Sequence, residues 1–361
     1  MGKRRSASFN TLVWDAEQYL RTEAVARRIE AIYREAIEEA VRIGLMVGAD
    51  RRGLDVPFSF EHLPQARIRA DRMLQLFAAR LMVLIQRGQE EAWLFASKKN
   101  DAMVQAIMGK SNLPKQALER YGNRNVEALS AFQGRKVGGL GLSERVWRQA
   151  EQLEQELAMS LDLGLGEGKS AAQLSREVRQ HLHQPERLFR RYRDRRGTLQ
   201  LSKNAKIYHP GQGVYRSSYK NAMRLTRTEV NMSYRESDHV RWKQLDFIVG
   251  FEVRKSNNHP VLDICDALAG RYPKTFKFTS WHPHCRCHAV PIFATEGEIN
   301  QLERMLLNEQ DTSGFRSVNA VRSVPASFRG WVNQNRDRIA RAKSKPLFVV
   351  ENLDEHLRFV G

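Results

Sequence analysis

Phe247-Ile-Val-Gly-Phe-Glu-Val253 decides the fold class, because it is the first stretch of the sequence that clearly predicts a β-strand. Its β-branched and aromatic residues favour an extended backbone. His288-Ala-Val-Pro-Ile-Phe293 predicts a partner strand, and Pro291 favours an edge position because proline donates no backbone hydrogen bond. Two such strands in a chain otherwise rich in helical patterns predict an α+β fold with a small antiparallel sheet in its C-terminal half.

Helical periodicity dominates the rest of the sequence. Apolar residues recur at helical spacing, with charges between them, in four stretches: residues 15–47, 64–93, 143–161 and 174–182. We interpret these stripes as core packing between antiparallel helices. Ser170 and Gln173 have the spacing of a capping box. Further helices fit residues 215–242 and 328–343, and residues 346–350 predict a short extended segment.

The charge of the chain is strongly positive. Its 59 Lys and Arg against 41 Asp and Glu give a net charge of +18. Such an excess favours a polyanionic partner, and nucleic acid is the commonest one. No apolar run approaches the roughly 20 residues that a membrane span needs, and no signal-peptide pattern follows Met1. We therefore expect a soluble protein, made in a cytoplasm, with no membrane partner.

One short segment concentrates this charge. It predicts a helix from Pro185 to Gly197, in which Phe189 and Tyr192 are interleaved with six arginines: Arg187, Arg190, Arg191, Arg193, Arg195 and Arg196. These guanidinium groups repel one another unless an anion compensates them, and a DNA phosphate backbone would do so. The alternative is a solvated helix face with the two aromatic residues in the core. The sequence favours neither interpretation over the other.

All three cysteines fall within 23 residues, as Cys265, Cys285 and Cys287. A structural zinc site would use these three thiolates and a fourth, non-sulfur ligand. The candidates for that ligand are His259, Asp263, His282, His284 and His288. Arg286 would balance the thiolate charge. A disulfide from Cys265 to Cys285 or Cys287, and a nucleophilic Cys285 with His284 as its base, are the alternatives.

The order of three motifs resembles a known family. Arg224-Leu-Thr-Arg-Thr-Glu229, Asp263-Ile-Cys-Asp-Ala-Leu-Ala-Gly270 and His282-Pro-His-Cys-Arg-Cys287 resemble the phage Mu F-like head morphogenesis proteins, over about residues 140–295. The resemblance assigns a structural role to six motif residues: Arg227, Thr228, Glu229, Gly270, Pro283 and Arg286. Many members of that family have a further cysteine where this chain has Leu262. A fourth ligand must therefore come from elsewhere, and His259 and Asp263 are nearest in sequence.

The helical pattern and the resemblance together predict a domain organisation. Residues 1–130 form a helical N-terminal region, and residues 143–295 form the Mu F-like head morphogenesis domain. Residues 296–361 form a C-terminal helical tail. Between the first two, residues 131–142 are a glycine-rich linker, because a helix precedes this stretch where a phosphate-binding loop would need a strand.

The resemblance also implies a function. It indicates a non-enzymatic minor head protein of a tailed double-stranded DNA phage, with no catalytic residue. The expected partners are the portal protein, capsid and scaffold proteins, and double-stranded DNA bound without sequence preference. The expected location is the virion, and the host cytoplasm during assembly. The alternatives are an enzyme or toxin-type effector, nuclease or ADP-ribosyltransferase-like, that uses Arg227 and Glu229, and a host DNA-binding module, for which no reader motif is evident.

Overall fold

The predicted strands pair in the computed structural model as two members of a three-stranded antiparallel sheet. Its order is β4 (Gly270–Tyr272), β3 (Ile248–Arg254) and β5 (His288–Phe293). β5 is therefore an edge strand, which confirms the position predicted from Pro291. The pairing register shifts between Ile248 and Gly250. With helices through most of the chain, the fold is α+β as predicted.

The structure describes residues 9–50, 58–109, 113–184, 192–193, 199–200, 217–256 and 262–360. The chain forms two units, and each is assembled from separate stretches of sequence. Unit 1 comprises Met1–Glu23, Arg87–Gly139 and Arg227–Gly361, and unit 2 comprises Ala24–Gln86 and Leu140–Thr226. Three helices, α1 (Leu12–Arg27), α3 (Pro64–Met108) and α10 (Ser218–Gln244), contribute residues to both units.

Unit 2 is built mainly from helices. Besides parts of α1, α3 and α10, it contains α2 (Ile29–Asp50), η1 (Phe60–His62), α6 (Leu142–Gly166) and α7 (Ala171–His183). Apolar residues of these helices form one buried core, as their periodicity predicts. The capping box of α7 is confirmed: Ser170 accepts a hydrogen bond from the Gln173 amide, and Gln173 accepts one from the Ser170 amide.

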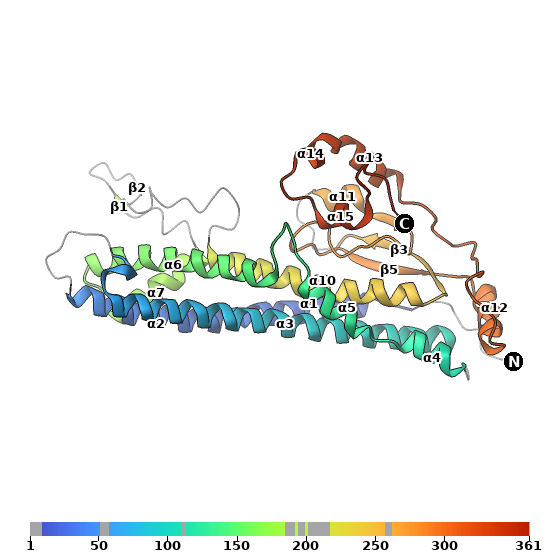
Figure 1. Ribbon diagram of the computed structural model, residues 1–361, viewed down its shortest axis with the longest axis horizontal. Coiled ribbons are helices and arrows are strands. Elements are labelled where there is room, and N and C mark those ends of the chain that lie inside the picture. The colour runs from blue at the N-terminus through green and yellow to red at the C-terminus, as the bar shows by residue number, and fades with distance from the viewer. Residues whose placement is uncertain are drawn as a thin grey trace. The chain divides into compact units, whose positions relative to one another are not determined.

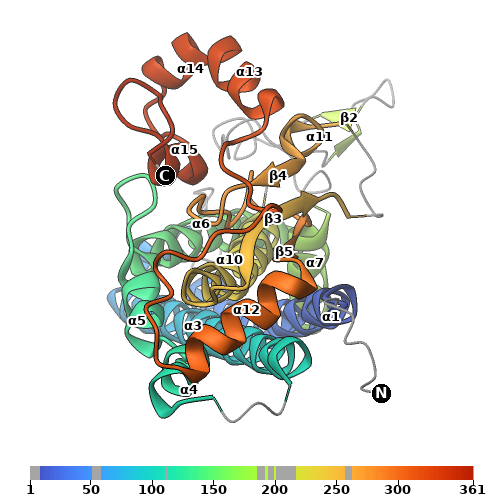
Figure 2. The same ribbon diagram turned by 90° about the vertical axis from the view of Figure 1, so that its right-hand side faces the viewer.

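Unit 1 surrounds the sheet. α10 runs beneath the sheet in Figures 1 and 2, and four short helices lie on its other side. These are α11 (Ile264–Leu268), α13 (Ala326–Gln334), α14 (Arg336–Arg341) and α15 (Leu347–Asn352). α4 (Lys115–Gly122), α5 (Val126–Gly134) and α12 (Glu296–Leu307) complete unit 1. Its core is rich in aromatic residues that contact one another, among them Tyr272, Phe276, Trp281, Phe328 and Phe348.

Several predicted elements differ from those observed. The helix predicted over residues 15–47 is interrupted at Arg28, between α1 and α2, and α3 continues well beyond residue 93. The extended segment predicted at 346–350 is wrong: Pro346 precedes α15, whose Phe348 and Val349 are buried in the core. Tertiary packing thus overrides the β-propensity of this short segment. The glycine-rich linker is partly helical, because α5 continues to Gly134.

The arginine-rich segment is also not a helix where the structure describes it. β1 (Tyr192–Arg193) pairs antiparallel with β2 (Leu199–Gln200). Arginines four residues apart repel each other on a helix, which disfavours the predicted form. The other five arginines, Arg187, Arg190, Arg191, Arg195 and Arg196, lie outside the described residues, as does His259.

Candidate metal centre

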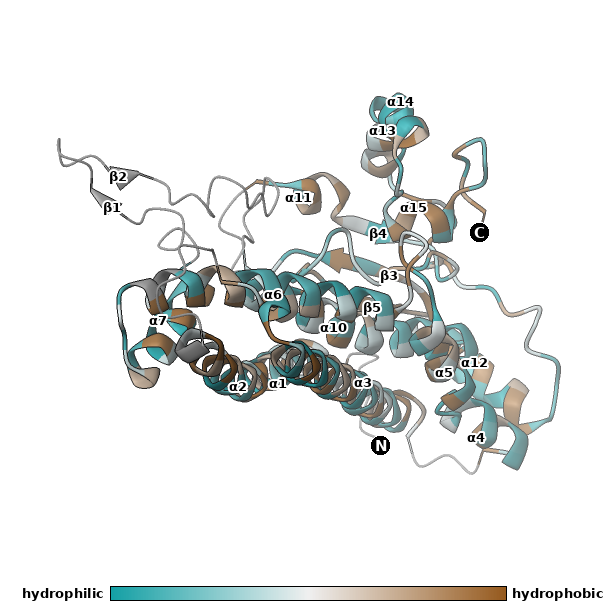
Figure 3. Cartoon of the chain, turned by 60° about the vertical axis from the view of Figure 1, so that its left-hand side comes forward, coloured by the Kyte–Doolittle hydropathy of each residue, from teal (hydrophilic) through white to brown (hydrophobic). Residues whose placement is uncertain are grey.

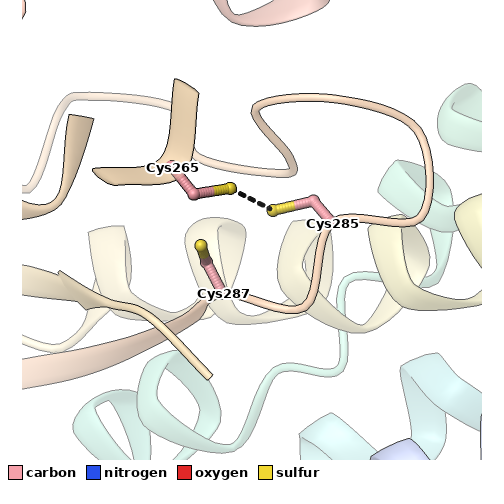
Figure 4. A group of neighbouring side chains, drawn as sticks. All are labelled: Cys265, Cys285 and Cys287. Atoms are coloured by element: carbon pink, nitrogen blue, oxygen red, sulfur yellow. Dashed lines mark hydrogen bonds between the residues drawn. The ribbon is translucent and has the colours of Figure 1, made fainter. Parts of the chain in front are cut away.

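The pairing register of the sheet brings the cysteines together. Gly270 begins β4 opposite Val253, and His288 begins β5 opposite Arg254. The chain therefore enters both flanking strands at the same end of β3. Cys265, in α11 just before β4, and Cys285 and Cys287, just before β5, meet at that end (Figure 4).

Asp263 fixes the entry to α11. Its carboxylate accepts a hydrogen bond from the Cys265 amide at 2.6 Å, and Asp266 accepts one from the Asp263 amide at 2.8 Å. Such an N-terminal cap satisfies amide groups that the helix leaves without partners. It also holds the Cys265 side chain in the first turn of α11, facing the loop that carries Cys285.

The three thiols form one buried cluster. Each cysteine is 1% exposed, and the three sulfur atoms lie within 4.8 Å of one another. The Cys265 and Cys285 sulfurs are 3.8 Å apart, and all three cysteines are free. A disulfide needs about 2.05 Å between sulfurs, whereas two thiolates on a tetrahedral zinc ion lie about 3.8 Å apart. The cluster has the spacing of a metal site.

His282 lies beside this cluster. Its Nε2 is 3.1 Å from the Cys265 sulfur, and its Nδ1 is 2.9 Å from the Pro283 carbonyl oxygen. Nδ1 therefore faces a backbone acceptor, and Nε2 is the ring nitrogen that faces the thiols. Asp263 lies 3.2 Å from the same Nε2 through Oδ2. Asp263, Cys265 and His282 thus form a second, partly exposed group of possible ligands, which shares Cys265 with the three thiols.

Two other predicted participants lie elsewhere. His284 has a left-handed backbone (φ 59°), and its amide donates to the Thr228 hydroxyl at 2.9 Å. Its ring faces Glu23, at 3.8 Å. Arg286 lies over the Tyr19 ring, 5.2 Å from its centroid. His284 belongs to neither of the ligand groups that the described residues form.

His288 is partly buried at the start of β5, and burial lowers the pKa of its imidazole. It does not belong to the ligand groups formed by the described residues.

Arg235 of α10 supplies a positive charge beside the thiols. Its guanidinium is buried and donates to the backbone carbonyls of Thr279, Cys285 and Cys287, the first two at 2.7 and 2.9 Å. Hydrogen bonds from the Cys265 and Cys287 thiols, together with the nearby Arg235, hold the pKa of Cys285 well below its usual value. The pKa of Cys265 is raised by its thiol neighbours and by burial.

The sequence prediction missed Arg235, although a signal exists. Arg235 follows Thr228 by seven residues, which places both on one face of α10. Thr228 holds the His284 amide and Arg235 holds the carbonyls on either side of Arg286. One helix face therefore positions the whole His282–Cys287 turn.

Arg227 and Glu229, two charged motif residues of α10, form ion pairs in unit 1. Arg227 donates to both oxygens of Glu23, at 2.8 and 2.6 Å. Burial acts to raise the pKa of Glu23, but interactions with His284 and Arg227 lower it to about 2. Glu229 is 1% exposed and accepts hydrogen bonds from Arg135 and Gln89, at 2.9 and 2.8 Å. Both motif charges thus have a partner of opposite sign.

Gly270 links the two cysteine-bearing regions at the start of β4. Its φ of 148° lies in a region that residues with a side chain rarely adopt, and a Cβ here would also meet Pro325 at 3.4 Å. A glycine therefore suits this turn from α11 into the sheet.

Comparisons with known proteins identify no relative: no family model, curated protein or solved structure matches the chain. Among the described helices, none combines the length and apolar character needed to cross a membrane.

Proposed function

We propose that the protein is a minor head protein of a tailed double-stranded DNA phage, acting in head morphogenesis at the portal vertex and on packaged DNA. One observation supports this most strongly: the three sequence motifs form one local structure. Thr228 of the first motif binds the His284 amide of the third, and Cys265 of the second contacts the thiol of Cys285. This convergence gives a physical reason for the order and spacing that the family resemblance rests on.

The arrangement of Arg227 and Glu229 favours this proposal over an enzyme. A catalytic carboxylate or guanidinium must be able to reach its substrate. Glu229 is buried and paired with Arg135, and Arg227 is paired with Glu23. Both pairs serve to position α10 within unit 1.

We further propose that the buried cluster holds a structural Zn²⁺ ion through Cys265, Cys285, Cys287 and His282. Three thiolates and one imidazole are a common donor set for structural zinc. The Pro283 carbonyl would orient the imidazole, as an outer hydrogen-bond acceptor commonly does. The ion would tie α11 to the entry of β5 and so hold the two sheet edges together.

Metal analysis tests the zinc site. We expect one zinc per chain in the wild-type protein purified without added metal, and a loss of at least tenfold in zinc affinity in C265S and H282A. The matched control is H284A, because His284 lies beside the cluster in sequence but faces Glu23. Full zinc retention in H282A would refute the proposed fourth ligand, and metal-free wild-type protein would refute the site.

Co-sedimentation tests the function. When a tagged chain is expressed from the phage or prophage that encodes it, we expect it to sediment with the heads in a density gradient and to crosslink to the portal protein. Recovery only in the host protein fractions would contradict the proposal. Nuclease or ADP-ribosylation activity that is lost in E229Q, in protein that remains folded, would support the enzyme instead.

A further inference from the structure

The C-terminal helices carry a strongly charged surface, which we call the basic face. It consists of six exposed cations on α13, α14 and the segment after them: Arg329, Arg336, Arg338, Arg341, Lys343 and Lys345. Asp337 is the one acidic residue between Ala326 and Pro346. Figure 3 shows α14 in mainly hydrophilic colours. The positive charge of the chain is therefore concentrated here as well as in the arginine-rich segment.

The basic face lies over the buried apolar core of unit 1. In α14, Ile339 is the one buried residue, and it belongs to the same core cluster as Phe328 and Val332 of α13 and Phe348 of α15. Trp331 packs on Phe348, with ring centroids 5.4 Å apart. The charged residues of α14 consequently face away from a fixed apolar anchor.

The described residues provide no carboxylate partner for the cations of the basic face. Within the part of the chain that the structure describes, none of the six forms an ion pair, whereas Arg67, Arg69 and Arg227 each pair with a carboxylate. Three basic-face arginines donate to backbone oxygens: Arg329 to Val324, Arg336 to His356 and Arg341 to Asp337. Such contacts orient a guanidinium and leave its charge uncompensated.

A turn from another part of unit 1 supports the end of the basic face. Gly138 has a positive φ of 58°, and a Cβ at this position would approach the Ser344 hydroxyl to 2.8 Å. The glycine therefore allows close contact between this turn and the segment that carries Lys343 and Lys345. The exposed Lys136 lies two residues before Gly138 and adds a further cation to this turn.

We propose that the basic face binds the phosphate backbone of duplex DNA. This proposal rests on the proposed function, the association with packaged DNA, and names the surface that makes the contact. Phosphates compensate clustered cations without any requirement for base contacts. Single-stranded nucleic acid would favour exposed aromatic side chains for stacking, but Trp331 and Phe348 pack against each other. A membrane-bound helix would expose apolar residues among its cations, but Ile339 points into the core.

The test is a salt titration of binding to a random-sequence DNA duplex, with R336A/R338A/R341A. If each arginine contacts one phosphate, the slope of log affinity against log salt falls by about 2.7 in magnitude. The ratio of the affinities at 50 and 200 mM salt then falls by about 40-fold relative to wild type. The control R34A/R72A/R176A removes the same charge from exposed positions on α2, α3 and α7. It should leave the slope nearly unchanged.

The outcomes distinguish DNA binding by the basic face from DNA binding by the arginine-rich segment and from a net-charge effect. Equal slopes for wild type and R336A/R338A/R341A would refute the basic face as a DNA site, and so would an equal loss in both triple variants, which indicates a net-charge effect. If R190A/R191A/R195A/R196A alone flattens the slope, the DNA site is the arginine-rich segment. No binding by the wild type at 50 mM salt would refute all DNA contact, while portal crosslinking tests head association separately. Circular dichroism melting of each variant confirms that it is folded.

Discussion

At the scale of single residues, buried charges in unit 1 depend on their partners. Glu229 is 1% exposed and its partner Arg135 has a side chain that is 14% exposed. Removing one charge of such a pair leaves the other without compensation in a poorly solvated environment. Breaking the pair therefore lowers the free energy of unfolding, even where the intact pair contributes no net stability.

Replacing Glu229 with Gln should therefore destabilise the protein. We expect a loss of about 3 kcal/mol in the free energy of unfolding, because glutamine keeps the shape but leaves Arg135 uncompensated. Urea unfolding measures it. The control is E17Q, since the Glu17–Arg21 pair is about half exposed and should contribute less than about 1 kcal/mol. Equal losses in the two variants would contradict the structural role of Glu229.

At the scale of elements, the sheet depends on a close approach at Gly250 of β3. A Cβ at this position would lie 2.7 Å from Val321 Cγ2 and 3.1 Å from the Tyr272 carbonyl oxygen. The Tyr272 contact is to backbone, which cannot rotate away. The register shift of β3 falls beside this glycine, so the irregular pairing and the tight packing occur together.

Replacing Gly250 with Ala should destabilise unit 1 by about 1–3 kcal/mol through overpacking. Thermal unfolding followed by circular dichroism measures the change. Gly297 of α12 provides the control, because a Cβ there meets nothing within 4 Å. G297A should leave the stability unchanged or raise it by up to about 1 kcal/mol, because alanine favours a helix. A G250A variant as stable as G297A would show that the sheet adjusts to the extra methyl group.

Local patterns predicted the elements well, and long-range contacts account for what they missed. The two strands, the Ser170 capping box and the long helices follow from residues close together in sequence. β4 is only three residues long and has no pattern of its own, since it depends on pairing with β3. Arg235 and the left-handed His284 were missed for the same reason. Their roles arise where α10 meets the turn before β5, and no local periodicity encodes that contact.

At the scale of the whole molecule, each unit has its own apolar core. The cluster that includes Trp281, Cys265 and Phe328 consists of unit 1 residues, and the cluster that includes Leu81 and Leu153 consists of unit 2 residues. The three cysteines belong to the first cluster. A metal ion bound by them would therefore stabilise unit 1 directly, by the free energy of its binding to the folded state.

Removing the proposed metal ion should consequently lower the stability of unit 1. A strong zinc chelator should lower the melting temperature reported by tryptophan fluorescence in W147F, because the other five of the six tryptophans lie in unit 1. A shift of several degrees is the expected scale for a loss of a few kcal/mol. C265S/W147F should melt at the lower temperature without chelator and show no further response to it. An equal chelator-induced shift in the melting temperature of C265S/W147F would mean that the chelator acts elsewhere. No shift in W147F would mean that the thiol cluster maintains unit 1 without a metal.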